Sequence, residues 1–392
     1  MAASFLKSLG TAVAILWQPV IGGISDRTVT RWGRRRPFIV VGTAGDLVFL
    51  VGIALAGSYW WLVVCYFLLQ LASNTAQAPY QGLLPDVVPP AQRGEASGFY
   101  GVANLVGIAG GTVGAGLLLV HGRSLAIASI IVVLVSTMVV TVLLVPDRAA
   151  PVEGQFQNLR EVLAKTFGVP FRNRAFVWLM VSRLLIFMGF GGLQNFAFFY
   201  FDNVFFHHDR RATAIAASTL LGIAITVAAL VTWPASRLSN RTGRRPLIFA
   251  AGLVGAVGSL VLVFSHYLWV PSGIVSPLAG ALRVPELAAQ ATLTGVAIGL
   301  GLGVFFSVDW AFIQDIIPPH EGGLYMGFSN IATAGAGIIA VFLGGPLLDG
   351  FNAGPRLLGL PGGFPVIFAL FGVWFVVGSL SILKVPERRV KA

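Results

Sequence analysis

The chain has little charge and almost no cysteine. Of its 392 residues only 10% are charged and 56% are hydrophobic, and the mean hydropathy is +0.84. A soluble protein carries about 25% charged residues, so the composition excludes an ordinary soluble domain. The single cysteine, Cys65, excludes an intramolecular disulfide. Apolar runs recur along the chain, and each is close in length to the roughly 20 residues that a helix needs to cross a bilayer. This pattern predicts an all-α polytopic membrane protein with the lipid bilayer as its partner.

Signals for catalysis, metals and nucleotides are also missing. Of five histidines only His207 and His208 are adjacent, with no cysteine nearby, and the chain has no GKS or GKT phosphate loop. The run GLGLG at 299–303 follows no predicted strand, so it is no nucleotide loop. The net charge of +11 invites a nucleic-acid partner, but the basic residues lie in short segments between apolar runs. We expect no enzyme activity, no cofactor, no metal and no nucleic acid.

Eleven segments have the length and polarity of membrane helices. The first could instead be a signal peptide, but no small-residue cleavage site follows it. We also predict a surface-lying helix at 156–167 and, because of three prolines, an external loop at 268–287. The predicted spans are roughly 4–24, 37–57, 59–85, 96–119, 124–145, 175–201, 212–236, 246–267, 288–316, 325–348 and 364–384.

The basic residues predict the orientation of these spans. Nineteen lie in the connections on one side and six on the other, and Arg183 lies inside a span. Because basic residues concentrate on the cytoplasmic side of a membrane, the first side is cytoplasmic and the carboxyl terminus lies inside. The arginine-rich loop 25–36 is then a topological anchor, and we expect the protein in the plasma (inner) membrane.

The sequence contains an internal repeat. PDVVPPAQRGEASGF (85–99) matches QDIIPPHEGGLYMGF (314–328) without gaps. This predicts two pseudo-symmetric halves, 1–145 (helices 2–6) and 175–392 (helices 7–12), joined by a cytoplasmic linker at 146–174. The span 175–201 has no counterpart in the first half, so the first of twelve helices is expected to be missing. Parallel repeats of this kind are a transporter architecture with the substrate between the halves.

Several motifs resemble known transporters. GGISDRTVTRWGRRRP (22–37) resembles the cytoplasmic signature of the major facilitator superfamily after helix 2, and RLSNRTGRRP (237–246) resembles its second copy. NTAQAPYQGLLPD (74–86) is similar to the glycoside and sucrose:cation symporter branch. The resemblance implies a major facilitator fold and transport by alternating access. Gln70 and Gln81 stand where that branch has an acid and a base, so its proton coupling does not carry over.

Four amides on the span 59–85 are candidate substrate ligands. Gln70, Asn74, Gln77 and Gln81 are spaced by 4, 3 and 4 residues, which places them on one helix face. Amides donate and accept hydrogen bonds, which suits a polyhydroxylated solute. Bonding between helices is the alternative.

Charged and polar side chains inside other spans are further candidates. Asp309 is a candidate ion-coupling residue, because a carboxyl inside a membrane is costly when ionised, and a structural ion pair is the alternative. Arg183 would be its counter-ion or a substrate anchor, unless it reaches the cytoplasmic surface. Gln194 lies on nearly the same helix face as Arg183, with Asn195 beside it, and both are candidate substrate ligands. Asp46 is a second coupling candidate, for which internal pairing is favoured over ligand contact.

The arginine loop also predicts a gate. Asp26 closes its helix and is expected to cap the span that starts near Tyr325, where an anion is favoured. In the superfamily the equivalent contact latches the cytoplasmic side shut, so the resemblance implies gating residues in both copies of the motif. They are Asp26, Arg27, Arg34 and Arg35, and Asn240, Arg241 and Arg244, in which an asparagine replaces the acid.

The sequence therefore predicts a monomeric secondary active transporter of a small polar solute, a sugar or glycoside, coupled to protons or sodium. Export of drugs or metabolites is an alternative. A non-transporting receptor or an inactive truncated remnant is another.

Overall fold

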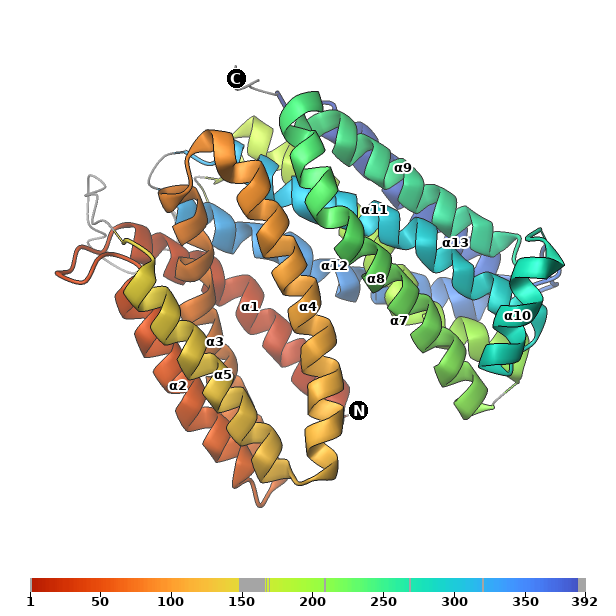
Figure 1. Ribbon diagram of the computed structural model, residues 1–392, viewed down its shortest axis with the longest axis horizontal. Helices are drawn as coiled ribbons and strands as arrows, with labels where there is room; N and C mark the ends of the chain where they lie inside the picture. The colour runs from red at the N-terminus through yellow and green to blue at the C-terminus, as the bar shows by residue number, and fades with distance from the viewer. Residues whose placement is uncertain are drawn as a thin grey trace. The chain divides into compact units, whose positions relative to one another are not determined.

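The computed structural model describes residues 2–147, 166, 168, 170–207, 209–267, 269–318 and 321–386. These residues are overwhelmingly helical, and no named strand occurs among them. The long helices, coloured in chain order in Figure 1, are α1 (Ala2–Asp26), α2 (Arg36–Ala54), α3 (Tyr59–Val87), α4 (Arg93–Val120), α5 (Arg123–Leu144), α7 (Arg174–Phe201), α8 (Arg210–Thr242), α9 (Arg244–Val263), α11 (Glu286–Ile316), α12 (Gly322–Asn352) and α13 (Gly363–Ile382). The short elements are η1 (Pro90–Gln92), η2 (Asp202–Phe206) and α10 (Ser272–Leu282).

Each predicted span coincides with one of these long helices, which confirms the all-α polytopic fold class. Within the described residues, nine helices are long and apolar enough to cross a membrane. The two long helices outside that set are α3, which contains the row of amides, and α4, which begins with Arg93 and Glu95. The total of eleven spans therefore stays a prediction.

The predicted loop at 268–287 is wrong, because it contains α10. This helix begins after Pro271 and keeps Pro277 in its interior. Val275 and Ala279, one turn apart, are buried, so tertiary packing outweighs the local cost of the interior proline. The predicted surface helix at 156–167 lies outside the described residues, except for Thr166.

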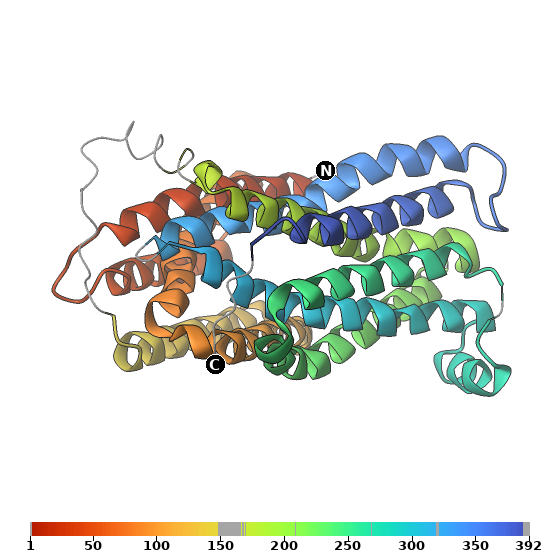
Figure 2. The ribbon, with the colours of Figure 1, turned by 90° about the horizontal axis from the view of Figure 1, so that it is seen from above.

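The chain forms two compact units. Unit 1 comprises 1–96, 107–177 and 313–335, and unit 2 comprises 97–106, 178–312 and 336–392. In unit 1, α3 packs against α1 and α2, and α2 also packs against α5 (Figure 1). In unit 2, α9 and α13 lie side by side, as Figure 2 shows from above. The boundaries 1–145, 146–174 and 175–392 stay a prediction from the repeat.

Glycines allow the close packing of α2 on α3. A Cβ on Gly42 would lie 2.5 Å from the backbone nitrogen of Ala76 and 2.7 Å from the carbonyl oxygen of Ala72. A larger side chain would force the two helices apart, as expected where small residues line a contact between membrane helices. This packing holds α3, with its amides, in place within unit 1.

Candidate functional site

A cluster of amides, two of them buried, lies between α1 and α3. Gln18 donates through Nε2 to Asn74 Oδ1 and, at 3.0 Å, to Gln77 Oε1. Gln18 and Asn74 are buried, and Gln77 is exposed. Gln18 Oε1 is buried and has no hydrogen-bond partner among the described residues. One acceptor is therefore left for a donor that the described side chains do not supply. Beside the cluster, Trp17 Nε1 donates to Thr75 Oγ1 at 2.8 Å.

The other two amides of the row engage different partners. Gln70 Nε2 donates to the hydroxyl of Tyr66 at 2.7 Å, one turn earlier on α3. Gln81 Oε1 accepts from Asn330 Nδ2 of α12 at 2.6 Å, and both side chains are buried. The structure thus brings Asn74 and Gln77 together with Gln18, and assigns Gln81 to a bond between helices.

Gln18 and Asn330 were not among the residues predicted from the sequence. The available signal for Gln18 was an amide next to Pro19 inside an otherwise apolar run. No spacing rule connects α1 or α12 to the amide row of α3, since the partners are separated by 56 residues for Gln18 and Asn74 and by 249 for Gln81 and Asn330.

In unit 2, a charged pair is buried between α7 and α11. Arg183 Nη1 donates to Asp309 Oδ2, and the two side chains are each 1% exposed. The guanidinium also lies 5.3 Å from the ring centre of Phe187 and 5.6 Å from that of Trp310. The predicted counter-ion is confirmed, and the alternative that Arg183 reaches the cytoplasmic surface is wrong.

Asp309 keeps one oxygen available. Its Oδ1 is buried without a hydrogen-bond partner among the described residues. Because an unsatisfied buried carboxylate oxygen is costly, this atom is a candidate site for a proton or a metal cation. Tyr100 packs against Trp310 with ring centres 4.4 Å apart, which extends the aromatic surroundings of Arg183.

The remaining predicted residues within spans are more dispersed. Asn195 Nδ2 donates to the carbonyl of Gly191 in its own helix at 2.7 Å, and Gln194 is exposed. On α2, Asp46 is buried, and its Oδ1 lacks a hydrogen-bond partner among the described residues. The internal pairing expected for Asp46 is therefore not seen at that atom.

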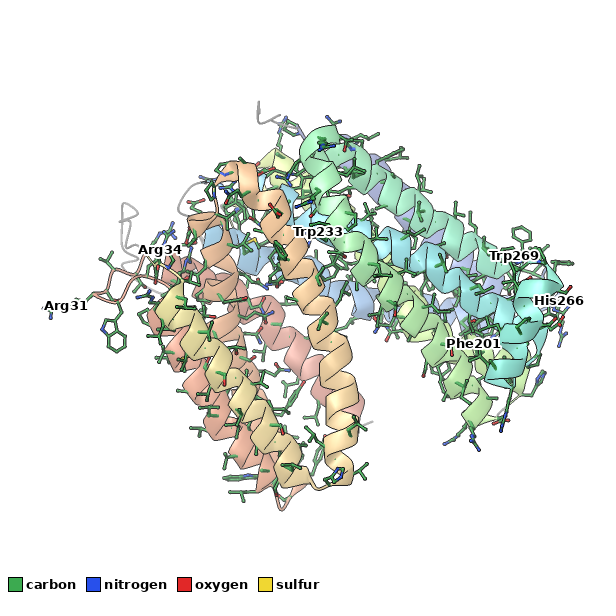
Figure 3. All side chains as sticks on the ribbon, viewed as in Figure 1. Arg31, Arg34, Phe201, Trp233, His266 and Trp269 are labelled. Atoms are coloured by element: carbon green, nitrogen blue, oxygen red, sulfur yellow. The ribbon has the colours of Figure 1, made fainter. Side chains whose placement is uncertain are left out.

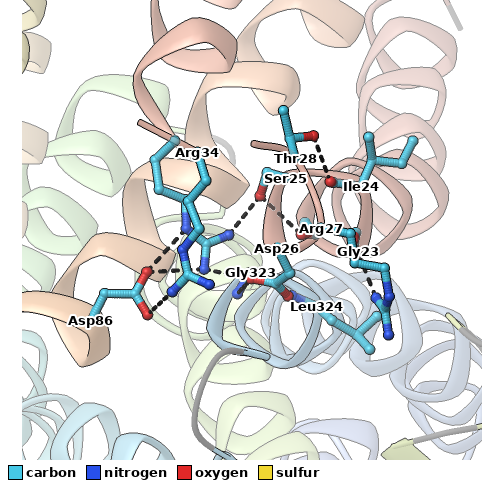
Figure 4. A network of polar contacts seen from close by, with 12 residues as sticks. Gly23, Ile24, Ser25, Asp26, Arg27, Thr28, Arg34, Asp86, Gly323 and Leu324 are labelled. Carbon is cyan, nitrogen blue, oxygen red and sulfur yellow. Dashed lines mark hydrogen bonds and ion pairs between the residues drawn. The ribbon is translucent and has the colours of Figure 1, made fainter. Parts of the chain in front are cut away.

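At the end of α1, the carboxylate of Asp26 caps α12 (Figure 4). Oδ1 accepts from the backbone N–H of Gly323 at 2.9 Å, and Oδ2 accepts from that of Leu324 at 2.8 Å. These donors lie in the first turn of α12, where no earlier carbonyl of the helix can accept from them. The predicted capping contact is confirmed. It requires a close approach, since a Cβ on Gly22 would lie 2.0 Å from the carbonyl oxygen of Gly323.

Two arginines extend this network to Asp86 near the end of α3. Arg35 pairs with Asp26 at 2.5 Å and with Asp86 at 3.1 Å, and it donates to Ser25 Oγ at 2.6 Å. Arg34 pairs with Asp86 at 2.5 Å. Burial lowers the pKa of Arg35, but the two carboxylates outweigh it and raise that pKa above its ordinary value. Asp86 lies in the repeated segment 85–99, but the sequence did not predict it as a site residue.

The other predicted gating residues are arranged less regularly. Arg27 donates to the carbonyl of Gly23 at 3.3 Å. In the second copy of the motif, Asn240 and Arg241 are exposed and Arg244 is buried. Asn240 of the second copy is therefore exposed, whereas Asp26, its counterpart in the first copy, is buried.

One arginine of the loop is exposed at its tip. Arg31 projects from the loop that joins α1 to α2, and the neighbouring Arg34 points back toward the helices (Figure 3). The loop turns at Gly33, whose φ of +107° favours glycine.

Comparison with known proteins identifies relatives among sugar transporters. Sucrose transport protein SUC4 of Arabidopsis thaliana is 23% identical over 444 aligned residues, covering 99% of this chain and 84% of that protein. Sucrose transport protein SUC3 of the same plant is 28% identical over 137 residues, which are 28% of this chain and 23% of SUC3. Proton-associated sugar transporter A of Homo sapiens is 34% identical over 123 residues, which are 28% of this chain and 16% of that protein. The last two matches span less than a quarter of those relatives' length.

Solved structures share the fold at low identity. The human organic anion transporter MFSD10 (TETRAN) superposes with a TM-score of 0.70 at 16% identity, covering 97% of this chain and 83% of that one. The proton:xylose symporter XylE bound to 6-bromo-6-deoxy-D-glucose gives a TM-score of 0.66 at 15% identity, covering 98% and 86%. The predicted fold is confirmed. The family model described as Major Facilitator Superfamily matches residues 1–341, and the chain belongs to this superfamily of membrane transporters.

Proposed function

We propose that this transporter moves a hydroxyl-rich solute, a sugar or glycoside, by secondary active transport with alternating access. The observation that carries the proposal is the cluster of Gln18, Asn74 and Gln77, in which Gln18 and Asn74 are buried. Gln18 Oε1 is an acceptor without a partner among the described residues, and a solute hydroxyl is a donor that fits it. Amides also accept and donate together, so one cluster can bind hydroxyls in both roles.

The similarity to a sucrose transport protein over nearly the whole chain supports this class of solute. The departures from that branch limit the comparison. Gln70 donates to Tyr66 and Gln81 accepts from Asn330, so both are engaged in bonds of neutral groups. Neither position supplies a charged side chain, so the proposed binding rests on the amides of Gln18, Asn74 and Gln77.

For cation coupling, we favour Asp309. A proton or sodium ion bound at Oδ1 would neutralise a carboxylate that now pairs with Arg183. The ion pair with Arg183 would then be weakened, which is unfavourable in a membrane interior, so cation binding would alter the contact between α7 and α11. Asp46 is the second candidate for this role.

For the gate, the network around Asp26 would hold the cytoplasmic end closed. Asp26 joins the start of α12 to Arg35, and Arg35 joins it to Asp86. The excess of basic residues in the connections on this side supports a cytoplasmic location for the network and for the carboxyl terminus.

Counterflow in proteoliposomes tests the proposed solute. Purified protein is reconstituted with an excess of unlabelled sugar inside, and the entry of labelled mono- and disaccharides and glycosides is measured. We expect exchange by the wild type and its loss in Gln18→Leu. Gln92→Leu is the matched control, because Gln92 is exposed in η1. Absence of exchange for every sugar would contradict the solute class, and full exchange by Gln18→Leu would contradict the site.

A further inference from the structure

The short helix α10 has two unlike flanks separated by a buried strip. Val275 and Ala279 form the buried strip. At 100° per residue, Ile274, Pro277, Leu278 and Ala281 lie on one side of it, and Ser272, Ser276 and Gly280 lie on the other. Ile274 is 58% exposed, and Ser276 donates to Glu286 Oε1 at 2.5 Å. The helix contains no charged residue. One flank is therefore apolar and uncovered, and the other is polar.

The membrane helix α9, which precedes α10 in the chain, also has an exposed apolar face. Leu253, Val257, Leu260 and Phe264 recur along α9 at helical spacing and are all exposed, as expected for side chains that face lipid. Tyr267 and Trp269 follow in the connection to α10 and are about half exposed. Figure 3 places Trp269 next to His266 at the end of unit 2 where α10 lies. Tyrosine and tryptophan concentrate at the membrane–water boundary, so this connection marks the depth at which α9 leaves the bilayer.

The connection is held firmly onto α11. Gln290 is fully buried, accepts through Oε1 from the backbone N–H of Trp269 at 2.8 Å and of Val270 at 3.0 Å, and donates to the carbonyl of Tyr267 at 2.8 Å. At the other end, Arg283 closes α10 in the left-handed conformation. α10 is therefore a fixed part of unit 2, set beside the ends of two membrane helices.

We propose that α10 lies in the headgroup region of the bilayer, with Ile274, Leu278 and Ala281 against lipid and Ser272 and Ser276 toward water. The occupant of the apolar flank is phospholipid, because α10 directly follows Tyr267 and Trp269, half-exposed aromatic residues of the kind that mark the membrane–water boundary. An amphipathic helix in this position places its apolar side roughly 5–10 Å into the boundary between headgroups and acyl chains. On the proposed topology this is the outer leaflet, and the contact fixes the depth of the start of α11.

Site-specific fluorescence in vesicles tests this placement. In a Cys65→Ala background, Ile274→Cys and Ala281→Cys on the apolar flank and Ser276→Cys on the polar flank are each labelled with an environment-sensitive fluorophore. The protein is reconstituted in phosphatidylcholine vesicles that contain lipids with a nitroxide at the headgroup or along the acyl chain. We expect several-fold stronger quenching at 274 and 281 than at 276, with blue-shifted emission at the first two.

Three outcomes would overturn the proposal. Weak quenching at all three positions would place α10 in water, and equal quenching would remove its orientation. Protection of 274 and 281 from the lipid quencher, together with cross-linking between copies through 274, would show that a second copy covers the flank. Because two apolar-flank positions are labelled, misfolding of one variant leaves the other to decide. None of the readouts depends on sugar transport, so the result is independent of the proposed function.

Discussion

Replacement of Asp26 by asparagine should release the start of α12. In the wild type, Asp26 is 1% exposed, accepts from Gly323 and Leu324 N–H, and pairs with Arg35 at 2.5 Å. Asparagine keeps one acceptor oxygen but loses the charge and the second acceptor. The Asp26→Asn variant therefore leaves one backbone donor of α12 and part of the charge of Arg35 without a partner.

The expected magnitude follows from the geometry of this network. Removing one partner of a buried ion pair costs about 3–5 kcal/mol. Arg35 still pairs with Asp86 at 3.1 Å, so we take the lower end, about 3 kcal/mol. Since 1.4 kcal/mol corresponds to a factor of ten, the opening constant at the start of α12 should rise on the order of 100-fold.

Hydrogen exchange of the backbone amides measures this opening directly. The amides of Gly323 and Leu324 should exchange on the order of 100-fold faster in Asp26→Asn. Asp147→Asn is the matched control, because Asp147 Oδ2 accepts from the backbone N–H of Arg35 at 2.7 Å and of Arg36 at 2.9 Å. That variant should deprotect the start of α2 and leave α12 protected. Unchanged exchange at the start of α12 in Asp26→Asn would refute the capping role.

Three further results are expected. Gly22→Ala places a Cβ 2.0 Å from the carbonyl oxygen of Gly323. It should reduce the free energy of unfolding by about 1–3 kcal/mol and lower the thermal unfolding midpoint. Gly57→Ala is the control and should leave the midpoint unchanged, because no atom lies within 4 Å of the new Cβ. Burial raises the pKa of Glu321 above 4.5, so its stabilising neutral form is lost as the pH rises through that pKa. Glu321→Gln should then gain thermal stability relative to the wild type with rising pH, and a pH-independent difference would contradict this. Asp309→Asn should abolish uphill, pH-driven uptake in vesicles but keep counterflow, and intact uphill uptake would exclude Asp309 as the coupling residue.

The contrast between Arg183 and the amide row shows how far local patterns reach. A buried arginine and a buried aspartate in separate spans predict each other, because an isolated charge in a membrane is costly, and the structure pairs them. The four amides of α3 were predicted to lie on one helix face and to bind substrate together. Helical spacing gives the direction of each amide but not its partner, and the structure distributes the partners among Gln18, Tyr66 and Asn330.

The apolar runs were enough to predict where the long helices lie, because in a bilayer the backbone must satisfy its hydrogen bonds within each run. The sequence also predicted the cap of α12 by Asp26, through the motif that the chain shares with its superfamily. Three features became visible only in the folded chain: Gln18 completes the amide cluster, Asp86 joins two arginines, and the proline-containing stretch after α9 is a helix. These depend on contacts between residues far apart in the chain, and no local rule of spacing or propensity contains that information.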